Sequence, residues 1–341
     1  MKPLLFVAEG LVMAATSSTG TPKGAVTMAS FAGSPAQGDD QTLTLRPLCI
    51  DGARAIDGLK LVETAGQPTM LYSTQAETQD RRYELVIRAA PIADLTRATE
   101  VARIGRMLPP PPQWDAQPVG DRYEIVYEMA GGAVNAILFQ DTQGNTRRVS
   151  GEHPFESFTR PHFVRVSTNG AAVSNVGAVA DLKKVVVFPR GTKQPVKYAA
   201  VADGVDGIVG GTTDHWVVAK RVMSGATLYD TLPGRLTLSR VGDTDTHGAT
   251  VPDLLAFELD AAPLANDVVV FATSKPALLL VGRRPDRPFR LAAQDRSWLL
   301  ALARPTILVT AQSVHVAAIV NPGGEQAVLL YGSVPIGALA Q

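Results

Sequence analysis

Residues 160–188, RPHFVRVSTNGAAVSNVGAVADLKKVVVF, decide the fold class of this chain. A basic residue and a proline lead into an apolar run, the turn STNG leads into a second run, and a third run ends on an aromatic residue. The same order recurs in residues 2–31 and 304–331, and partial copies begin at Arg46-Pro47 and Lys275-Pro276. Proline suits the first residue of a strand, because the ladder does not need its missing N–H there. Each copy therefore predicts three consecutive antiparallel strands.

Strand-like runs of four to seven residues follow one another along nearly the whole chain, with turn signals such as TQGN and NPGG between them. This density predicts an all-β fold. Sheets of three or four strands that recur every ~40 to 50 residues are typical of a β-propeller. We expect a single repeat domain over residues 1–341, and the alternative is a set of multi-sheet β-sandwich domains.

One segment departs from this pattern. PIADLTRATEVARIGRML, residues 91–108, has helix formers throughout, an aspartate near its start and apolar residues at helical spacing, and it runs into Pro109–Pro112. It predicts a short helical insertion near residues 92–108 followed by a stiff connector, because the prolines cannot continue a helix. Residues 92–118 would then be either an insertion or a linker between domains.

The basic residue and proline that open each copy, as in Arg160-Pro161 and Arg304-Pro305, resemble the blade starts of five-bladed glycoside-hydrolase-like propellers and related lectin propellers. The resemblance covers about three blades. It implies a propeller that binds a glycan or hydrolyses a glycosidic bond. The Trp-Asp ending and the sialidase-type Ser-x-Asp-x-Gly-x-Thr-Trp turn do not occur in the sequence.

Composition narrows the classes of partner. Lys plus Arg equals Asp plus Glu at 32 each, and the basic residues are not clustered in the sequence. Nucleic acids and anionic membranes bind clustered positive charge, so the sequence gives no reason to expect either as a partner. The only cysteine, Cys49, excludes an intramolecular disulfide. Residues 2–16, KPLLFVAEGLVMAAT, open with a lysine and an apolar run, but Glu9-Gly10 interrupts that run. We therefore expect a folded strand pair and synthesis in the cytoplasm without a signal peptide, with a virion or another extracellular particle as a destination.

Two stretches are candidates for binding. ADGVDGIVGGTTDHW contributes a ligand-binding set in which carboxylates beside glycines could hold a hard cation and the indole could stack on a sugar: Asp203, Asp206, Asp214, His215 and Trp216. The alternative is a glycine-rich loop capped by its own aspartates, with the indole in the core. GDTDTHGATVPD matches part of a calcium loop through Asp243, Asp245 and His247, but its twelfth position is Leu254 instead of glutamate. A solvated hairpin turn is the alternative there.

A third stretch, SGEHPFESFTRPHF, brings two carboxylates and two imidazoles close in sequence: Glu152, Glu156, His153 and His162. Glycoside hydrolysis needs two carboxylates in separate roles. Propeller glycosidases take theirs from different blades, so no catalytic residue is assigned. No cofactor is expected apart from calcium at the loop above.

The main functional hypothesis is a non-catalytic structural or protein-interaction propeller, a homo- or hetero-oligomeric component of a larger assembly such as a phage virion or tail. Neutral charge, scattered polar residues and an aromatic content of 6% support it. The alternative is a glycan-binding or glycoside-hydrolysing propeller. Acidic residues from separate blades, such as Asp40, Asp51, Glu156 and Asp214, would favour this alternative if they converged beside an aromatic ring. A lining of Val, Ala and Thr would exclude it.

Overall fold

The computed structural model describes the following residues: 4–8, 11–15, 27–30, 42–48, 56–77, 83–107, 113–131, 134–150, 157–168, 171–180, 184–188, 196–200, 205–211, 215–220, 235–240, 259–265, 268–273, 277–281, 289–293, 302–321 and 327–339. The chain divides into two units, Met1–Asp40 and Gln41–Gln341. Among the described residues, no helix is long and apolar enough to cross a membrane.

The first unit is a small antiparallel sheet in the order β1-β2-β3. Its strands are β1 (Leu4–Ala8), β2 (Leu11–Ala15) and β3 (Thr27–Ser30). Leu4 lies opposite Ala15, and Leu11 lies opposite Ser30. The three strands predicted in residues 2–31 are therefore present.

The described strands of the second unit form five hydrogen-bonded sheets, one of which has eight strands and consists of two blades joined by a shared strand, so we number six blades in chain order. Blade 1 is β5 (Ile56–Thr64), β6 (Gln67–Glu77), β7 (Tyr83–Pro91) and β8 (Thr99–Met107). Blade 2 is β9 (Trp114–Val119), β10 (Arg122–Gly131), β11 (Val134–Gln140) and β12 (Thr146–Arg148). Blade 3 is β13 (Phe158–Thr168), β14 (Ala171–Ala180), β15 (Lys184–Phe188) and β16 (Val196–Ala200).

The remaining blades follow in the same manner. Blade 4 is β17 (Val205–Gly211), β18 (His215–Lys220) and β19 (Arg235–Arg240). Blade 5 is β20 (Leu259–Ala265), β21 (Val268–Thr273), β22 (Ala277–Val281) and β23 (Phe289–Ala293). Blade 6 is β24 (Leu302–Val309), β25 (Ser313–Val320) and β26 (Val328–Pro335), followed by the short helix α1 (Ile336–Leu339).

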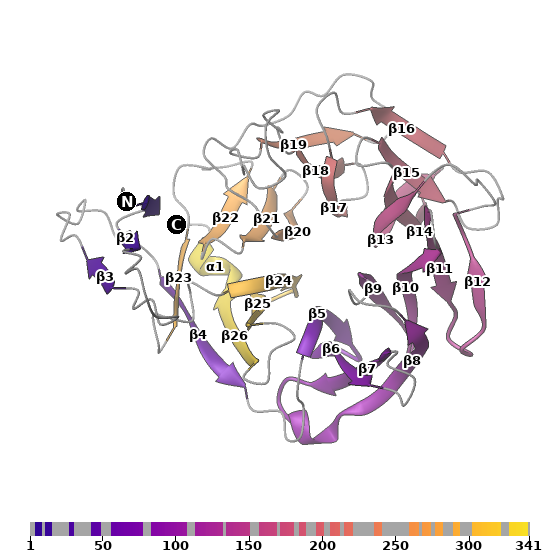
Figure 1. Ribbon diagram of the computed structural model, residues 1–341, viewed down its shortest axis with the longest axis horizontal. Coiled ribbons are helices and arrows are strands. Elements are labelled where there is room, and N and C mark those ends of the chain that lie inside the picture. The colour runs from indigo at the N-terminus through magenta and orange to yellow at the C-terminus, as the bar shows by residue number, and fades with distance from the viewer. Residues whose placement is uncertain are drawn as a thin grey trace, which may run out of the picture. The chain divides into compact units, whose positions relative to one another are not determined.

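The first strand of each blade contacts the first strand of the next, and β24 contacts β5, so these inner strands form a closed cycle. Figure 1 shows the blades following one another round a ring. A cycle of small antiparallel sheets around a central channel defines a β-propeller. The predicted propeller is confirmed. Six blades are found among the described residues, compared with five in the propellers that the sequence resembles.

The ring is closed by a strand from the other end of the second unit. Strand β4 (Thr42–Leu48) pairs antiparallel with β26, with Leu330 opposite Pro47, and parallel with β23. Leu43 and Leu45 are buried in a cluster with Val316 and Leu330 of blade 6. Strand β4 thus supplies the outer strand of blade 6 (Figure 1).

The Arg-Pro pairs lie inside inner strands and not at their first residues. Arg160-Pro161 in β13 and Arg304-Pro305 in β24 each fall at a register shift against the neighbouring strand. A bulge leaves one residue without a ladder partner, so the proline costs no hydrogen bond there. The repeat seen in the sequence at these two places is therefore a bulge in the inner strand.

The helix predicted near 92–108 is wrong for most of its length. Only Leu95–Arg97 forms a 3₁₀ helix, which begins after Asp94, and Thr99–Met107 forms strand β8. Ala102 and Ile104 are buried against blade 2, while Arg103 between them is exposed. Side chains in this segment therefore alternate between the core and solvent, as in a strand. Burial of one face of the strand stabilises this segment more than the helix propensity of its single residues would stabilise a helix. Pro109–Pro112 lies outside the described residues.

The hydrophobic core lies between neighbouring blades. Blades 1 and 2 bury Leu71, Leu85, Ile87 and Ile125 in one cluster. Blades 2 and 3 share a second hydrophobic cluster, in which Phe158 and other residues of β13 contact β10 and β11. Face-to-face packing of this kind fixes the order of the sheets and so directs one edge of every blade toward the channel.

Candidate functional site in the central channel

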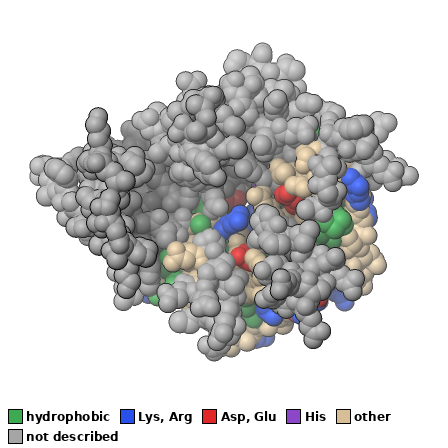
Figure 2. Space-filling model, viewed as in Figure 1, with side chains coloured by type: hydrophobic (Ala, Val, Ile, Leu, Met, Phe, Trp, Pro, Cys, Tyr) green, Lys and Arg blue, Asp and Glu red, His purple; other side chains and the backbone are tan. Residues whose placement is uncertain are grey.

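Charged side chains from four inner strands meet in the channel. Lys60 of β5 places Nζ 3.2 Å from Oδ1 of Asp115 on β9 and 3.6 Å from Oδ2 of Asp260 on β20. Blades 1 and 5 are not neighbours in the cycle, so the Lys60 side chain reaches across the channel. Figure 2 shows basic and acidic side chains together near the middle of the visible face. We call Lys60, Asp115, Asp260 and His162 the channel cluster.

Asp115 connects blades 2 and 3. Its Oδ1 accepts a hydrogen bond from Ala116 N at 2.9 Å, and its Oδ2 accepts one from Phe163 N at 2.8 Å. His162 Nδ1 lies 3.5 Å from the same Oδ2. Burial opposes ionisation of Asp115, but the charge of Lys60 and these hydrogen bonds outweigh it and hold its pKa far below the usual value. The carboxyl is therefore ionised at neutral pH and has a donor on each oxygen.

Asp260 connects blades 5 and 6 in the same manner. Its Oδ2 accepts hydrogen bonds from Thr306 Oγ1 and Ile307 N, each at 3.0 Å. Leu61 N of blade 1 in turn donates to Thr306 Oγ1 at 3.0 Å. Burial opposes the charge of Lys60, but its two carboxylate partners outweigh this and raise its pKa. An unbroken polar chain thus links blades 5, 6, 1, 2 and 3.

The two aspartates use the bulges described above. Each is the second residue of its inner strand, and each bonds the amide of the residue two positions after an Arg-Pro pair, Phe163 or Ile307. Strands β13 and β24 are edge strands, so amides on their open side can bond the preceding blade. Aspartate and Arg-Pro therefore form one inter-blade contact that occurs twice.

Asp57 is the second residue of β5 and lies at a register shift. It is 8% exposed, and its Oδ2 has no hydrogen-bond partner among the residues that the structure describes. Burial raises its pKa, against a hydrogen bond from Gln75 and the charge of Arg304. Arg304 itself has φ +52°, in the left-handed region that is unfavourable for arginine. A buried polar atom without a partner and a strained backbone are both enriched at binding sites.

Of the ligand-binding residues predicted in blade 4, Asp206, His215 and Trp216 lie on described strands, at opposite ends of one hairpin. Asp206 is the second residue of β17, next to the rung between Val205 and Lys220, whereas His215 and Trp216 begin β18 at the far end. Five residues of strand separate these ends, roughly 17 Å. Their side chains, together with Asp203 and Asp214, lie outside the described residues, so their role in binding stays a prediction.

The predicted calcium residues Asp243, Asp245 and His247 also lie outside the described residues, as do Glu152, His153 and Glu156. His162, from the third stretch, is described and contacts Asp115. Among the described residues, no three His, Cys, Asp or Glu side chains lie close enough to hold a metal ion. Calcium stays a prediction.

Lys60, Asp115 and Asp260 were not predicted from the sequence, although a signal was present. Four inner strands begin with an apolar residue, an aspartate and a small residue: Ile56-Asp57-Gly58, Trp114-Asp115-Ala116, Val205-Asp206-Gly207 and Leu259-Asp260-Ala261. The same triplet occurs at Ile50-Asp51-Gly52, outside the described strands, so the motif alone does not select the sites.

No protein-family model and no curated protein sequence matches the chain. Among solved structures, it is similar to the GH93 α-L-arabinofuranosidase of Fusarium graminearum in complex with arabinobiose, at 9% identity and TM-score 0.53, over 88% of this chain and 99% of that one. It is also similar to Trypanosoma rangeli sialidase in complex with the inhibitor DANA, at 7% identity and TM-score 0.50, over 88% of this chain and 59% of that one. Both are β-propellers, and the similarity concerns the fold alone. The chain is a β-propeller, with six blades among the described residues.

Proposed function

We propose that the protein binds a glycan at the end of the channel where the inner strands begin. The observation that supports this is the convergence of Lys60, Asp115, His162 and Asp260 from four separate blades. Convergence of acidic residues from separate blades is one half of the arrangement that favours the glycan hypothesis, and an aromatic ring beside them is the other half. The residues differ from those named in advance, since Asp40, Asp51, Glu156 and Asp214 lie outside the described residues. The arabinofuranosidase and the sialidase carry carbohydrate-directed activities on the same fold.

Sugar hydroxyl groups both donate and accept hydrogen bonds, and the channel offers both kinds of partner. The Lys60 side chain is 22% exposed and that of His162 is 28% exposed, so both remain accessible after pairing with carboxylates. Nδ1 of His162 is the nitrogen beside Asp115, which leaves Nε2 for a ligand. Asp57 adds a carboxyl oxygen that a ligand hydroxyl would satisfy.

Binding fits this geometry better than hydrolysis does. A glycosidase needs one carboxyl as acid and a second as base or nucleophile, with a free oxygen on each. Both oxygens of Asp115 are engaged, one by Lys60 and Ala116 N and the other by Phe163 N and His162. Asp115 therefore positions Lys60 and His162, and these two side chains make the contacts with the ligand.

The structural hypothesis receives no support from the described surface. Val119 and Met129 are the large apolar side chains exposed among the described residues. Val119 ends β9, and Met129 lies near the far end of β10, so the two do not form one patch on blade 2. The described surface therefore offers no apolar patch that would support a role in a virion or another assembly.

A glycan array followed by titration calorimetry tests the proposal. We expect the wild-type protein to bind a subset of glycans and His162→Gln to weaken that binding by roughly 2- to 10-fold, the effect of losing one hydrogen bond. Arg103→Gln is the matched control, because Arg103 lies on the outer strand β8. Absence of any bound glycan, or equal affinity of His162→Gln and wild type, would contradict the proposal.

A further inference from the structure

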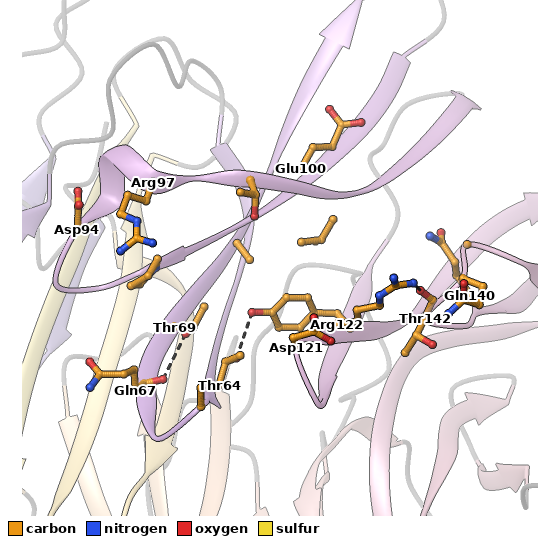
Figure 3. A pocket seen from close by; sticks show the side chains of 18 of the residues that line it. Thr64, Gln67, Thr69, Asp94, Arg97, Glu100, Asp121, Arg122, Gln140 and Thr142 are labelled. Carbon is orange, nitrogen blue, oxygen red and sulfur yellow. Dashed lines mark hydrogen bonds between the residues drawn. The ribbon is translucent and has the colours of Figure 1, made fainter.

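A cleft of about 890 Å³ lies between blades 1 and 2. Its walls are the β5–β6 turn, the segment around the 3₁₀ helix, the β9–β10 turn and the β11–β12 turn. These lie at the end of the inner strands opposite to the channel cluster. Thr64 is four residues beyond Lys60 on β5, and Asp121 is six residues beyond Asp115, which is roughly 13 to 20 Å along a strand. Figure 3 shows the cleft from close by.

Uncharged polar side chains from both blades line part of the cleft, beside charged and small apolar ones. Hydroxyl and amide groups are contributed by Thr64, Thr69, Gln67, Gln140, Thr142 and Gln143. The half-buried ring of Tyr123 stands between the blades, and its hydroxyl forms a hydrogen bond with Thr64 Oγ1 at 3.1 Å, drawn dashed in Figure 3. The ring gives the cleft one apolar surface that is fixed in place.

The acidic side chains of the cleft are partly occupied by their own turns. Asp94 accepts hydrogen bonds from Thr96 N and Oγ1, at 3.2 and 2.5 Å. Asp141 accepts from Asn145 Nδ2 at 3.0 Å and from Asn145 N and Gln143 N, each at 2.9 Å, and these bonds lower its pKa. Both carboxylates therefore shape the rim of the cleft.

Three other charged side chains of the cleft are available to bind a ligand. Arg97 of blade 1 has no carboxylate within 4.0 Å among the described residues, and the same holds for Arg122 of blade 2, whose Nη1 donates to Thr142 O at 3.2 Å. Asp121 is exposed, and the described part of the chain contains no ion pair to it. Donors and acceptors without partners thus face the cleft from two blades.

We propose that this cleft is a second carbohydrate site and that it takes a neutral oligosaccharide. Arg97 and Arg122 disfavour a cationic ligand, and the carboxylates of Asp94, Asp121 and Asp141 disfavour an anionic one. Sugar hydroxyls satisfy donors and acceptors alike, and the face of a sugar ring packs on tyrosine. The volume lies within the ~300 to 1,000 Å³ typical of small-molecule sites. The inference rests on the proposed glycan binding for its ligand class and on the cleft alone for its location.

Hydrogen exchange with mass spectrometry locates binding at each site separately. The probes are neutral hexasaccharides of arabinose, xylose, glucose and galactose, compared with a hexagalacturonate and a poly-glutamate peptide. We expect at least one neutral probe to slow exchange in peptides that cover residues 64–67, 119–123 and 140–145. The double variant Arg97→Ala/Asp121→Ala should weaken this binding at least 10-fold. Both side chains are exposed, so the fold should persist.

Two controls separate this inference from the proposed function. Arg46→Ala removes an exposed charge from β4 and should leave binding in the cleft unchanged. His162→Gln should reduce protection near residues 157–163 but not protection of the cleft. If the double variant binds as wild type does, or if only the galacturonate or the acidic peptide protects the cleft, the inference is overturned. Protection of the cleft without protection near His162 would overturn the channel site and uphold the cleft.

Discussion

Replacing Lys60 by methionine tests the channel cluster most directly. The change keeps most of the side-chain volume and removes the ammonium that lies 3.2 Å from Asp115 and 3.6 Å from Asp260. The side chains of these aspartates are 4% and 9% exposed, so two carboxylates would be left in the interior without their common counter-charge. Removing one partner of a buried ion pair costs about 3–5 kcal/mol. We expect Lys60→Met to lower the free energy of unfolding by that amount.

The loss should depend on pH. In the wild type, the pKa of Asp115 is lowered, so its contribution is present above the unfolded pKa of about 4 and is lost only as pH falls through the lower folded value. In the variant, burial still opposes ionisation of Asp115, and the charge of Lys60 that outweighed it is gone, so the pKa of Asp115 should rise. Ionising Asp115 then costs stability as pH rises through that higher pKa. The gap between the two proteins should therefore be largest at pH 7 and smaller at pH 4.5.

Urea unfolding at the two pH values measures this gap. Arg103→Met is the matched control, because Arg103 also lies between two carboxylates, Glu84 at 2.8 Å and Glu100 at 2.7 Å, but with its side chain 47% exposed. Solvent screens such a pair, so its loss should be far smaller and nearly independent of pH. A Lys60→Met variant as stable as the control, or a gap equal at both pH values, would refute the reasoning.

Three further changes probe other contacts. Burial raises the pKa of Asp57, so the wild type loses stability as pH rises through that value. In urea unfolding, the free energy of unfolding of Asp57→Asn should therefore increase relative to that of the wild type between pH 4 and pH 7. Thr306→Val removes the donor to Asp260 and leaves Leu61 N without its acceptor, which should cost about 1–3 kcal/mol by the same assay. In Gly332→Ala the new Cβ would lie 2.8 Å from Thr44 O, and a thermal melt should show a loss of about 1–3 kcal/mol as β4 is displaced.

Much of the fold could be predicted from local sequence. Strand-length runs and turn signals identify nearly every sheet, since both are local properties of the chain. The segment near 92–108 could not be assigned correctly in this way, because Val101, Ile104 and Met107 are also spaced as on a helix. The burial of Ala102 and Ile104 between blades 1 and 2 decided the outcome, and burial depends on the assembled sheets.

The channel cluster depends even more on the assembled ring. Lys60 and Asp260 are 200 positions apart and lie on blades that are not neighbours, so only closure of the whole cycle brings them together. The intervals between the aspartates at positions 57, 115, 206 and 260 are unequal, because the segments between the blades differ in length. Their common place at the second position of a strand becomes visible only when the strands are known.

Strand β4 also determines when folding can finish. Leu48 pairs with Leu329, so the last contact of the ring joins positions separated by most of the chain. Bringing such distant segments together costs chain entropy that shorter-range pairings do not, which slows folding. Blades 1 to 4 can pair their own strands as they leave the ribosome, whereas β4 leaves early and has to wait for its two partners, β23 of blade 5 and β26 of blade 6. During that interval β4 presents unpaired edges, and these edges are where aggregation or binding by a chaperone would begin.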